Sequence, residues 1–304
     1  MSQSHVANLF RSLGLPEDAI DAHVHPYELL DSPGFDGVGA VRPDLAQDYP
    51  AAVIESTVLE SGFSQAIMVQ VNDPHQGSFE EAQRFDTIAS TSSVLTRCVV
   101  GADLTKGRAL SAELDRLVLL RSVCGVRVIG PQDSGAGYYG SREVRDALSC
   151  LGTYRFACDL LIRERNHGQM TEIVRLLGDL GSTGGTFIGD HLLKPSGIEK
   201  GRPTGSWRST LKRLANHPRF YLKISGLPGE VPQGTASEKF YPFLDEALEA
   251  LGGDRLIFGS DYPVSYAHTQ SVALILNWMQ VRGLRGYATR IFRTNAMAAY
   301  GLNV

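Results

Sequence analysis

Short apolar runs rich in β-branched residues alternate along the chain with segments in which apolar residues recur every three or four positions. The runs predict eight β-strands: Ala19–His25, Gln65–Val71, Thr96–Leu104, Cys124–Gly130, Arg155–Ile162, Gly185–Leu192, Phe220–Leu227 and Asp254–Val264. The periodic segments predict helices: Pro50–Gly62, Phe79–Ser90, Ala109–Ser122, Ser141–Leu151, His167–Leu180, Ser206–Asn216, Ser237–Leu251, Thr269–Arg282 and Tyr287–Tyr300.

Eight strand–helix units in succession predict parallel strands joined by crossover helices, and such a sheet can close into a barrel. The predicted fold class is therefore α/β, a (β/α)8 TIM barrel. A doubly wound open sheet is the alternative, but the first strand is followed by HPYELL rather than by a glycine-rich turn. Barrels of this size form one unit, so residues 1–304 are expected to be a single domain, with 1–18 as an N-terminal extension.

The segments that follow the strands are longer and richer in Gly, Pro and polar residues than those that precede them. Residues 26–49 form the longest and are expected to lie over the active face; the others are 72–78, 131–140, 194–205 and 227–235. In barrels, the loops after the strands build the active site. Functional residues are therefore expected at the C-terminal ends of the strands.

Composition and charge exclude several classes of function. The formal net charge is −4 without a long basic run, so the sequence indicates no nucleic-acid partner. No apolar run approaches the roughly 18 residues of a membrane span, and the N-terminus has no signal pattern, which indicates no membrane partner. The four cysteines include no C-x-x-C pair and predict reduced, buried thiols in a cytoplasmic protein. The expected partner is a small-molecule substrate, and a homo-oligomer stays open.

His23 and His25 form an H-x-H pair at the end of the first predicted strand. Alternate residues of a strand face the same side, about 6.6 Å apart at roughly 3.3 Å per residue, so the two imidazoles can converge on one cation. Val24 would then point outward, toward the helices. On its own, an H-x-H pair is more often incidental than a pair of metal ligands.

Two more residues of metal-ligand type lie at strand ends. Asp261, in LIFGSDYPV, ends the eighth strand, which neighbours the first strand in a closed barrel. His191, in TFIGDHLLKP, ends the sixth strand. Asp261 could instead cap a turn, and His191 could be an ordinary strand-end histidine. Four such residues at C-terminal strand ends nevertheless predict a shared site.

The motifs DAHVHP, GVRV, DHLLKP, LKISGL, DRLIFGSDYPV and RIFRTNAMAAY follow one another over almost the whole chain. With them the sequence resembles the amidohydrolase superfamily, and within it the amidohydrolase-related (family 2) lactonases, which include the sugar-lactone hydrolases and the 2-pyrone-4,6-dicarboxylate lactonases. The resemblance implies a distorted barrel that hydrolyses a small, usually acidic lactone. It also implies that Asp261 is the general base, with His23, His25 and His191 around a metal or the substrate carbonyl.

The fourth strand departs from the pattern of the binuclear amidohydrolases. Its sequence CGVRVIG offers an arginine and no lysine that could be carbamylated to bridge two metals, so one divalent ion at most is expected. Nitrogen donors favour Zn²⁺ over magnesium or calcium, and the predicted ligands are His23, His25, His191 and Asp261. Members of the family differ in their need for a metal, so metal-independent catalysis stays open. The stretch VIGPQDSGAG also lacks the further arginine of the pyrone-dicarboxylate lactonases.

Arg127 and Lys223 are charged residues within apolar strands. Arg127 either clamps a carboxylate of the substrate or pairs with a buried acid. Lys223 shares the inward face of the seventh strand with Ser225. It either stabilises the oxyanion or leaving alkoxide, as a catalytic residue beside Asp261 and His191, or pairs with Asp261.

Substrate binding is predicted for Arg127, Ser225, Gln70 and Tyr262, with a carboxylate-bearing substrate expected from the arginine. Gln70 could equally cap its strand, and Tyr262 could pack under a loop. The remaining histidines are expected outside the site: His75 and His268 at the surface, and His5, His167 and His217 as structural or exposed residues. Asp190, next to His191, could be solvated.

The predicted function is hydrolysis of a small lactone or related cyclic ester. The first alternative is a zinc-dependent decarboxylase of a small aromatic or unsaturated acid, which uses the same barrel and a similar H-x-H and Asp. Hydrolysis of a cyclic amide or imide needs the same apparatus. A binding protein that has kept the pocket and lost catalysis is the alternative outside enzyme chemistry.

Overall fold

The structure, a computed structural model, describes residues 3–31, 42–71, 78–131, 137–154, 156–181 and 185–302. All eight predicted strands are present and form one sheet in chain order, each parallel to the next. The strands are β1 Ile20–Val24, β2 Gln65–Val69, β3 Arg97–Gly101, β4 Val123–Ile129, β5 Ala157–Leu161, β6 Thr186–Gly189, β7 Phe220–Ile224 and β8 Leu256–Phe258. The predicted (β/α)8 barrel is confirmed. Parts of the loops predicted over the active face, with His75, lie outside the described residues.

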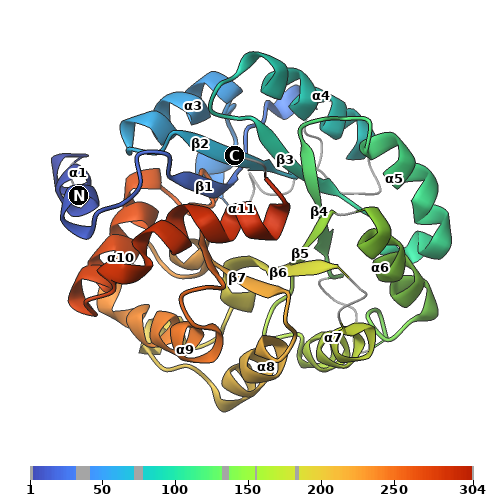
Figure 1. Cartoon of the computed structure of the whole chain (residues 1–304). Helices are drawn as coiled ribbons and strands as arrows, with labels where there is room; N and C mark the ends of the chain where they lie inside the picture. The colour runs from blue at the N-terminus through green and yellow to red at the C-terminus, as the bar shows by residue number, and fades with distance from the viewer. Residues whose placement is uncertain are drawn as a thin grey trace.

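Figure 1 looks along the barrel, with the helices in a ring around the strands. The ring consists of α3 Ala51–Glu60, α4 Ser78–Thr91, α5 Ser111–Leu117, α6 Arg142–Tyr154, α7 His167–Leu180, α8 Gly205–Ala215, α9 Tyr241–Leu251 and α10 His268–Val281. The extension predicted for residues 1–18 contains a further helix, α1 (Gln3–Leu13), which packs outside the ring against α10. Within the described residues, no helix combines the length and apolar character that a membrane crossing needs.

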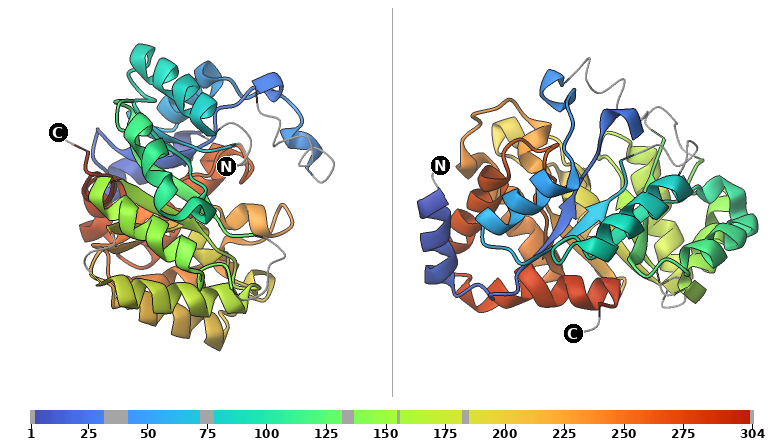
Figure 2. Two further views of the ribbon diagram at one scale, coloured as in Figure 1. Left: turned by 90° about the vertical axis from the view of Figure 1, so that its right-hand side faces the viewer. Right: turned by 90° about the horizontal axis from the view of Figure 1, so that it is seen from above.

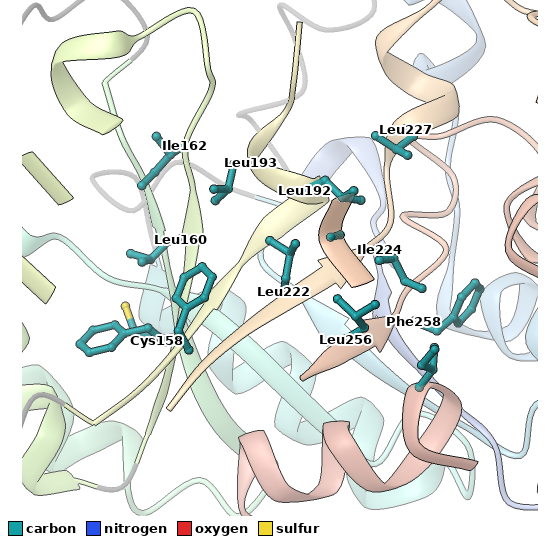
Figure 3. Close-up of a cluster of buried hydrophobic side chains, with 14 of the residues drawn as sticks. Cys158, Leu160, Ile162, Leu192, Leu193, Leu222, Ile224, Leu227, Leu256 and Phe258 are labelled. Atoms are coloured by element: carbon teal, nitrogen blue, oxygen red, sulfur yellow. The ribbon is translucent and has the colours of Figure 1, made fainter. Parts of the chain in front are cut away.

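Side-chain alternation separates the outside of the barrel from its interior. On β7, Leu222 and Ile224 join the hydrophobic cluster beneath the helices, together with Leu256 and Phe258 of β8. Figure 3 shows this cluster from the β5–β8 side. Because neighbours along a strand face opposite sides, Lys223 is directed into the barrel, as predicted.

All eight strands end before the predicted residue, and two of them, β6 and β8, leave the sheet next to candidate site residues. β6 ends at Gly189 because the backbone of the next turn is left-handed from His191 to Lys194. β8 ends at Phe258, and Asp261 is left-handed as well, with φ of 60°. The apolar patterns of these segments predicted continuous strands because a change of backbone handedness leaves no periodic trace.

The first and last strands meet without a regular ladder among the residues that the structure describes. A single bridge joins Val24 to Tyr262. The other backbone bonds across this seam run from the amide of Asp261 to the carbonyl of His23 (2.8 Å) and from the amide of His25 to the carbonyl of Tyr262 (2.8 Å). The barrel is therefore distorted at the seam, in agreement with the family resemblance.

Helix α11 (Asn295–Tyr300) lies across the ring and packs against an inner cluster of side chains from the strands. In Figure 2 the C-terminus lies at one end of the barrel, and the short blue segments after β1 lie at the opposite end. The helix therefore closes the end that faces away from the strand C-termini. Tyr300 extends from it into the interior, where its hydroxyl donates to the carboxylate of Asp159 at 2.8 Å.

Replacing Tyr300 with Phe tests how strongly this end of the barrel is tied to its interior. The change keeps the ring and removes one hydrogen bond to a buried carboxylate, so the free energy of unfolding should fall by about 1–3 kcal/mol. Urea denaturation followed by circular dichroism measures it. Tyr154→Phe, which removes a hydroxyl donating to Asp115 at the surface, is the matched control. Equal stability of Tyr300→Phe and native protein would show that the hydrogen bond from Tyr300 to Asp159 does not stabilise this end of the barrel.

Candidate active site

Four side chains from three elements converge at the C-terminal end of the barrel: His23 and His25 of the first strand, His191 after β6 and Asp261 after β8. The Nε2 atoms of His23 and His25 lie 3.1 Å apart. Asp261 Oδ1 lies 3.2 Å from Nε2 of His25, 3.5 Å from that of His23 and 3.6 Å from that of His191. All four residues are at most 4% exposed. The convergence predicted from strand ends is therefore present in the structure.

The separations match the size of a metal site. Bonds of about 2.0–2.1 Å in a tetrahedral zinc site place the ligand atoms roughly 3.3 Å from one another. The separations measured among His23, His25 and Asp261 lie between 3.1 and 3.5 Å, and Asp261 Oδ1 lies 3.6 Å from His191. The ligand atoms of His23, His25 and Asp261 all lie within 4.8 Å of one another. Two imidazole nitrogens and one carboxylate oxygen are a donor set that catalytic zinc sites use, with one position left open. His23, His25 and Asp261 thus fit a single divalent ion, and His191 lies beside them.

Left-handed turns and closely packed glycines orient three of these side chains. His191 has φ of 51° and Asp261 has φ of 60°, a region that non-glycine residues adopt at a cost and that is common at functional sites. Gly226 approaches His191 so closely that a Cβ there would lie 2.4 Å from Nδ1. A Cβ at Gly259 would lie 2.7 Å from that of His23. Any larger residue at either glycine would displace an imidazole.

Hydrogen bonds on the far side of each group fix its orientation. His25 Nδ1 donates to the carbonyl of Val69 at 2.9 Å, which leaves the lone pair of Nε2 toward the centre of the site. His191 Nδ1 lies 2.9 Å from Ser225 Oγ. Asp261 Oδ2 accepts from the hydroxyl of Ser265 at 2.7 Å, so Oδ1 is the oxygen that faces the imidazoles. Ser225 therefore supports His191, a role that its predicted part in substrate binding did not include.

Burial favours the neutral form of His23 and His191. It lowers the pKa of His191 to about 4, and burial followed by the charge of Lys223 lowers the pKa of His23 well below its ordinary value. Burial alone would raise the pKa of Asp261, but His191, a hydrogen bond with His25 and His23 outweigh it and lower that pKa. Two neutral imidazoles and an ionised carboxylate are the protonation states that metal binding requires of these ligands.

A network of buried charges lies beneath the imidazoles. Lys223 Nζ lies 2.5 Å from Asp159 Oδ2, 3.3 Å from Asp190 Oδ1 and 3.0 Å from His23 Nδ1. Arg127 donates from Nε to Asp190 Oδ2 at 2.9 Å and from Nη1 to a backbone carbonyl. Asp159, Asp190 and Lys223 are 0% exposed, and Arg127 is 5% exposed. Two cations and two carboxylates thus neutralise one another inside the barrel.

The network corrects three predictions. Lys223 does not pair with Asp261, because its ammonium lies among Asp159, Asp190 and His23. Asp190 is not solvated; it is fully buried and carries the ion pair with Arg127. For Arg127, the pairing with a buried acid holds in place of a carboxylate clamp. Asp159 was missed, although it is the parallel-ladder partner of Arg127 and, like it, a charge within an apolar strand.

Gln70 and Tyr262 lie at the edge of the site. Gln70 is buried, and its backbone carbonyl oxygen accepts the hydrogen bond from Arg127 Nη1. Tyr262 is half-buried, packs its ring against those of Tyr49 and His268, and lines a cavity of about 370 Å³. Contact of either residue with a substrate remains a prediction.

The prediction for His268 was wrong. The residue is 2% exposed, and its Nε2 lies 2.9 Å from Asp21 Oδ2. Asp21 was also missed, although a carboxylate inside the apolar run of β1 requires a partner. His217 is structural, with its Nε2 donating to the carbonyl of Gly181, and His167 is exposed, both as predicted. The side chain of His5 lies outside the described part of the chain.

Comparison with known proteins finds relatives in sequence and in fold. L-fucono-1,5-lactonase from Burkholderia ambifaria is 25% identical over 246 residues, covering 81% of this chain and 80% of the relative. An amidohydrolase from Burkholderia multivorans, solved with bound zinc, is 24% identical with a TM-score of 0.79, covering 94% of this chain and 99% of that one. 2,6-Dihydroxybenzoate decarboxylase from Rhizobium is 15% identical with a TM-score of 0.61, covering 93% and 98%. The two structures share the fold of this chain.

A family model extends the comparison over the whole barrel. The model of the amidohydrolase family matches residues 20–302, from the start of β1 to the end of the described chain. It includes His23, His25, His191 and Asp261. The chain belongs to the amidohydrolase family.

Proposed function

We propose that the chain is a lactonase that opens a small lactone or related cyclic ester with water, using Asp261 as general base. The observation that carries the proposal is the convergence of Asp261 Oδ1 on three imidazole nitrogens at 3.2–3.6 Å. The similarity to L-fucono-1,5-lactonase over 81% of the chain supports a lactone as the substrate. A carboxylate in this setting can accept a proton from water while the imidazoles face the carbonyl that is attacked.

The residues that would hold a divalent ion, zinc by its donor set, are His23, His25 and Asp261, with His191 beside them. When bound, such an ion polarises a carbonyl and makes a coordinated water more acidic. Asp261 takes the proton of the attacking water at Oδ1, because Ser265 occupies Oδ2. The same oxygen then returns the proton to the ring oxygen that leaves as an alkoxide. His25, held by Val69, keeps Asp261 in place during both transfers.

Lys223 is proposed to act through its neighbours, since its ammonium is 0% exposed. Its Nζ lies 3.0 Å from His23 Nδ1, and Asp190, with which it pairs, lies 3.5 Å from the same nitrogen. A proton on Nδ1 that faces Asp190 leaves the lone pair of His23 Nε2 toward the centre of the site. The charge pairs of Lys223 with Asp159 and Asp190 keep this support in the protein interior. Direct contact with the leaving alkoxide has no support in this geometry.

A cavity beside the cluster supports a substrate that bears a carboxylate. It has a volume of about 310 Å³ and is formed by the segments after β5, β6 and β7. Four cationic and two acidic side chains line it, for a net charge of +2: Arg163, Arg165, Lys194, Lys200, Glu199 and Glu230. Lys194 follows His191 by three residues in the same left-handed turn. An anionic group in this cavity would therefore lie on the catalytic face, beside the turn that carries His191.

Arg163 is the cation best placed to bind that group. Lys194 already pairs with Glu230, whereas Arg163 makes no ion pair with the described residues. Partial burial lowers the pKa of Arg163, and the charge of Glu230 opposes part of this shift. A partly desolvated guanidinium binds a carboxylate strongly. Arg163 thus takes over the clamp that the sequence assigned to Arg127.

The compartment is a further part of the proposal. All four cysteines are free, and Cys98, Cys124 and Cys158 are buried. Free thiols fit the reducing conditions of the cytoplasm. We therefore retain a cytoplasmic enzyme acting on a small molecule as the proposed setting.

Replacing Asp261 with Asn tests the general base. The amide keeps the shape of the carboxylate but accepts no proton, so kcat for lactone opening should fall by about 10²–10⁴-fold. A pH-indicator assay on a panel of sugar lactones, aromatic lactones and cyclic imides measures it, with carbon dioxide release from aromatic acids followed in parallel. Asp254→Asn, at an exposed ion pair with Arg290, is the control. Near-native lactone opening by Asp261→Asn would remove Asp261 from the mechanism, and carbon dioxide release without lactone opening would favour the decarboxylase.

Metal removal tests the proposed ion. Dialysis against a strong chelator should remove about one equivalent of zinc and abolish lactone opening, because Asp261 would then have only weakly acidic water to deprotonate. Adding back zinc should restore the activity, and elemental analysis measures the metal content at each step. Full activity in protein that retains no metal would establish the metal-independent alternative.

Replacing Arg163 with Gln tests the anionic subsite. The loss of one charge-assisted hydrogen bond should raise KM for a carboxylated lactone by about ten- to a hundredfold. KM for the matching lactone with a primary amide in place of the carboxylate should stay within about twofold. Arg208→Gln, which breaks an ion pair with Glu246 between two outer helices, is the control. An equal rise for both substrates would show that Arg163 does not select the carboxylate.

A further inference from the structure

The weakest join of the barrel lies within the candidate active site. His23 and His25 stand on one side of the β1–β8 seam, and Asp261 stands on the other. Only one bridge, between Val24 and Tyr262, joins these strands in the described part of the chain. The distance between Asp261 and the two imidazoles therefore depends on whatever else holds the seam together.

The carboxylate of Asp21 spans the seam. Its Oδ1 accepts the amide of His23 at 3.1 Å on one side and the amide of Ser260 at 2.9 Å on the other. These two amides belong to a predicted metal ligand and to the residue directly before Asp261. One oxygen atom thus fixes the backbone of both walls of the site.

His268 holds that carboxylate from outside the barrel. Its Nε2 donates to Asp21 Oδ2 at 2.9 Å, and its Nδ1 lies 2.8 Å from the hydroxyl of Ser61. Asp21, His268 and Ser61 are 0%, 2% and 4% exposed. Since His268 begins α10 and Ser61 directly follows α3, the chain of hydrogen bonds ties the seam to two helices of the ring.

The same three residue types form the nucleophilic triad of many hydrolases. Here the geometry argues against nucleophilic use. The imidazole of His268 packs edge-on against the rings of Phe63 and Tyr262, with centroids 5.7 and 5.9 Å away. Asp21 Oδ1 also accepts two backbone amides next to the imidazole–carboxylate cluster. The three residues therefore hold the backbone amides of His23 and Ser260 in place, and the hydroxyl of Ser61 is buried away from any substrate.

We propose that His268 is a positioning residue that sets the geometry of the metal site through Asp21. This inference rests on the zinc site of the proposed function. Without the imidazole, Asp21 Oδ2 loses its buried partner, the carboxylate is free to rotate, and both seam amides lose their common acceptor. His23 and Asp261 then hold the ion in a looser arrangement, although neither ligand has changed.

The test compares His268→Leu with His268→Gln, which retains an N–H donor toward Asp21. Zinc affinity is measured on the metal-free proteins by competition with a chromophoric chelator. We expect affinity to fall by about ten- to a hundredfold in His268→Leu, as is typical when a partner of a metal ligand is removed, and by less in His268→Gln. kcat should fall in the same order with KM within about twofold. The visible spectrum of the cobalt-substituted leucine variant should change.

A matched control separates this effect from general loss of stability. His217→Leu removes another buried histidine, whose Nε2 donates to Gly181 beneath the outer helices. Its zinc affinity should remain within about twofold of native, even if its unfolding temperature falls as far as that of His268→Leu. If His268→Leu does not fold, the smaller loss expected in His268→Gln carries the test.

Native zinc affinity in the folded His268 variants would overturn the inference. Loss of activity in Ser61→Ala with zinc affinity intact would also overturn it, in favour of the nucleophilic triad. Failure of the proposed function has a different signature: native protein that binds zinc but opens no lactone leaves the positioning role of His268 intact. Native protein that binds no zinc would overturn the positioning role of His268 and would leave lactone opening by Asp261 to be judged from the activity assay.

Discussion

The balance of buried charge inside the barrel is the constraint on which the site depends. Lys223 and Arg127 face Asp159 and Asp190, and all four side chains are at most 5% exposed. Removing one member of such a pair leaves an uncompensated buried charge, which typically costs about 3–5 kcal/mol. The four groups therefore require one another. Their balance leaves the carboxylate of Asp261 as the net charge of the cluster above.

This arrangement also explains why the imidazoles can remain neutral. Burial disfavours the charged form of His23, and the ammonium of Lys223 at 3.0 Å adds to that effect. A histidine in bulk water would be partly protonated near neutral pH and would compete poorly for a metal. The lysine thus contributes to ligand chemistry from a position that no substrate reaches, and its charge acts through the ring of His23.

How much the sequence could predict follows from which contacts are local. The hydrophobic pattern predicts where the strands end and in which order they lie. These two properties are sufficient to place His23, His25, His191 and Asp261 together. His268 could not be placed this way. Its partner Asp21 lies 247 positions away in the sequence, and His268 is the first residue of its helix rather than the end of a strand. The same holds for the left-handed turn at His191 and for the pairing of Arg127 with Asp190. Buried charges in apolar strands did indicate that partners exist, without identifying them.

Two regions of opposite charge therefore share the catalytic face. The imidazole–carboxylate cluster contains the ionised carboxylate of Asp261, and the cavity at Arg163 and Lys194 carries a net charge of +2. The acid group of an anionic lactone would be repelled by Asp261 and attracted to the cavity as the molecule approaches this face. The lactone would therefore be oriented, with its acid group at the cavity and its carbonyl at the cluster, before close contact forms. The cavity is built from segments after β5, β6 and β7, whereas the seam that carries the base is built from β1 and β8. Substitutions in the segments that line the cavity can change which substrate binds without disturbing the hydrogen bonds that hold Asp261. In this way one barrel can support several reactions.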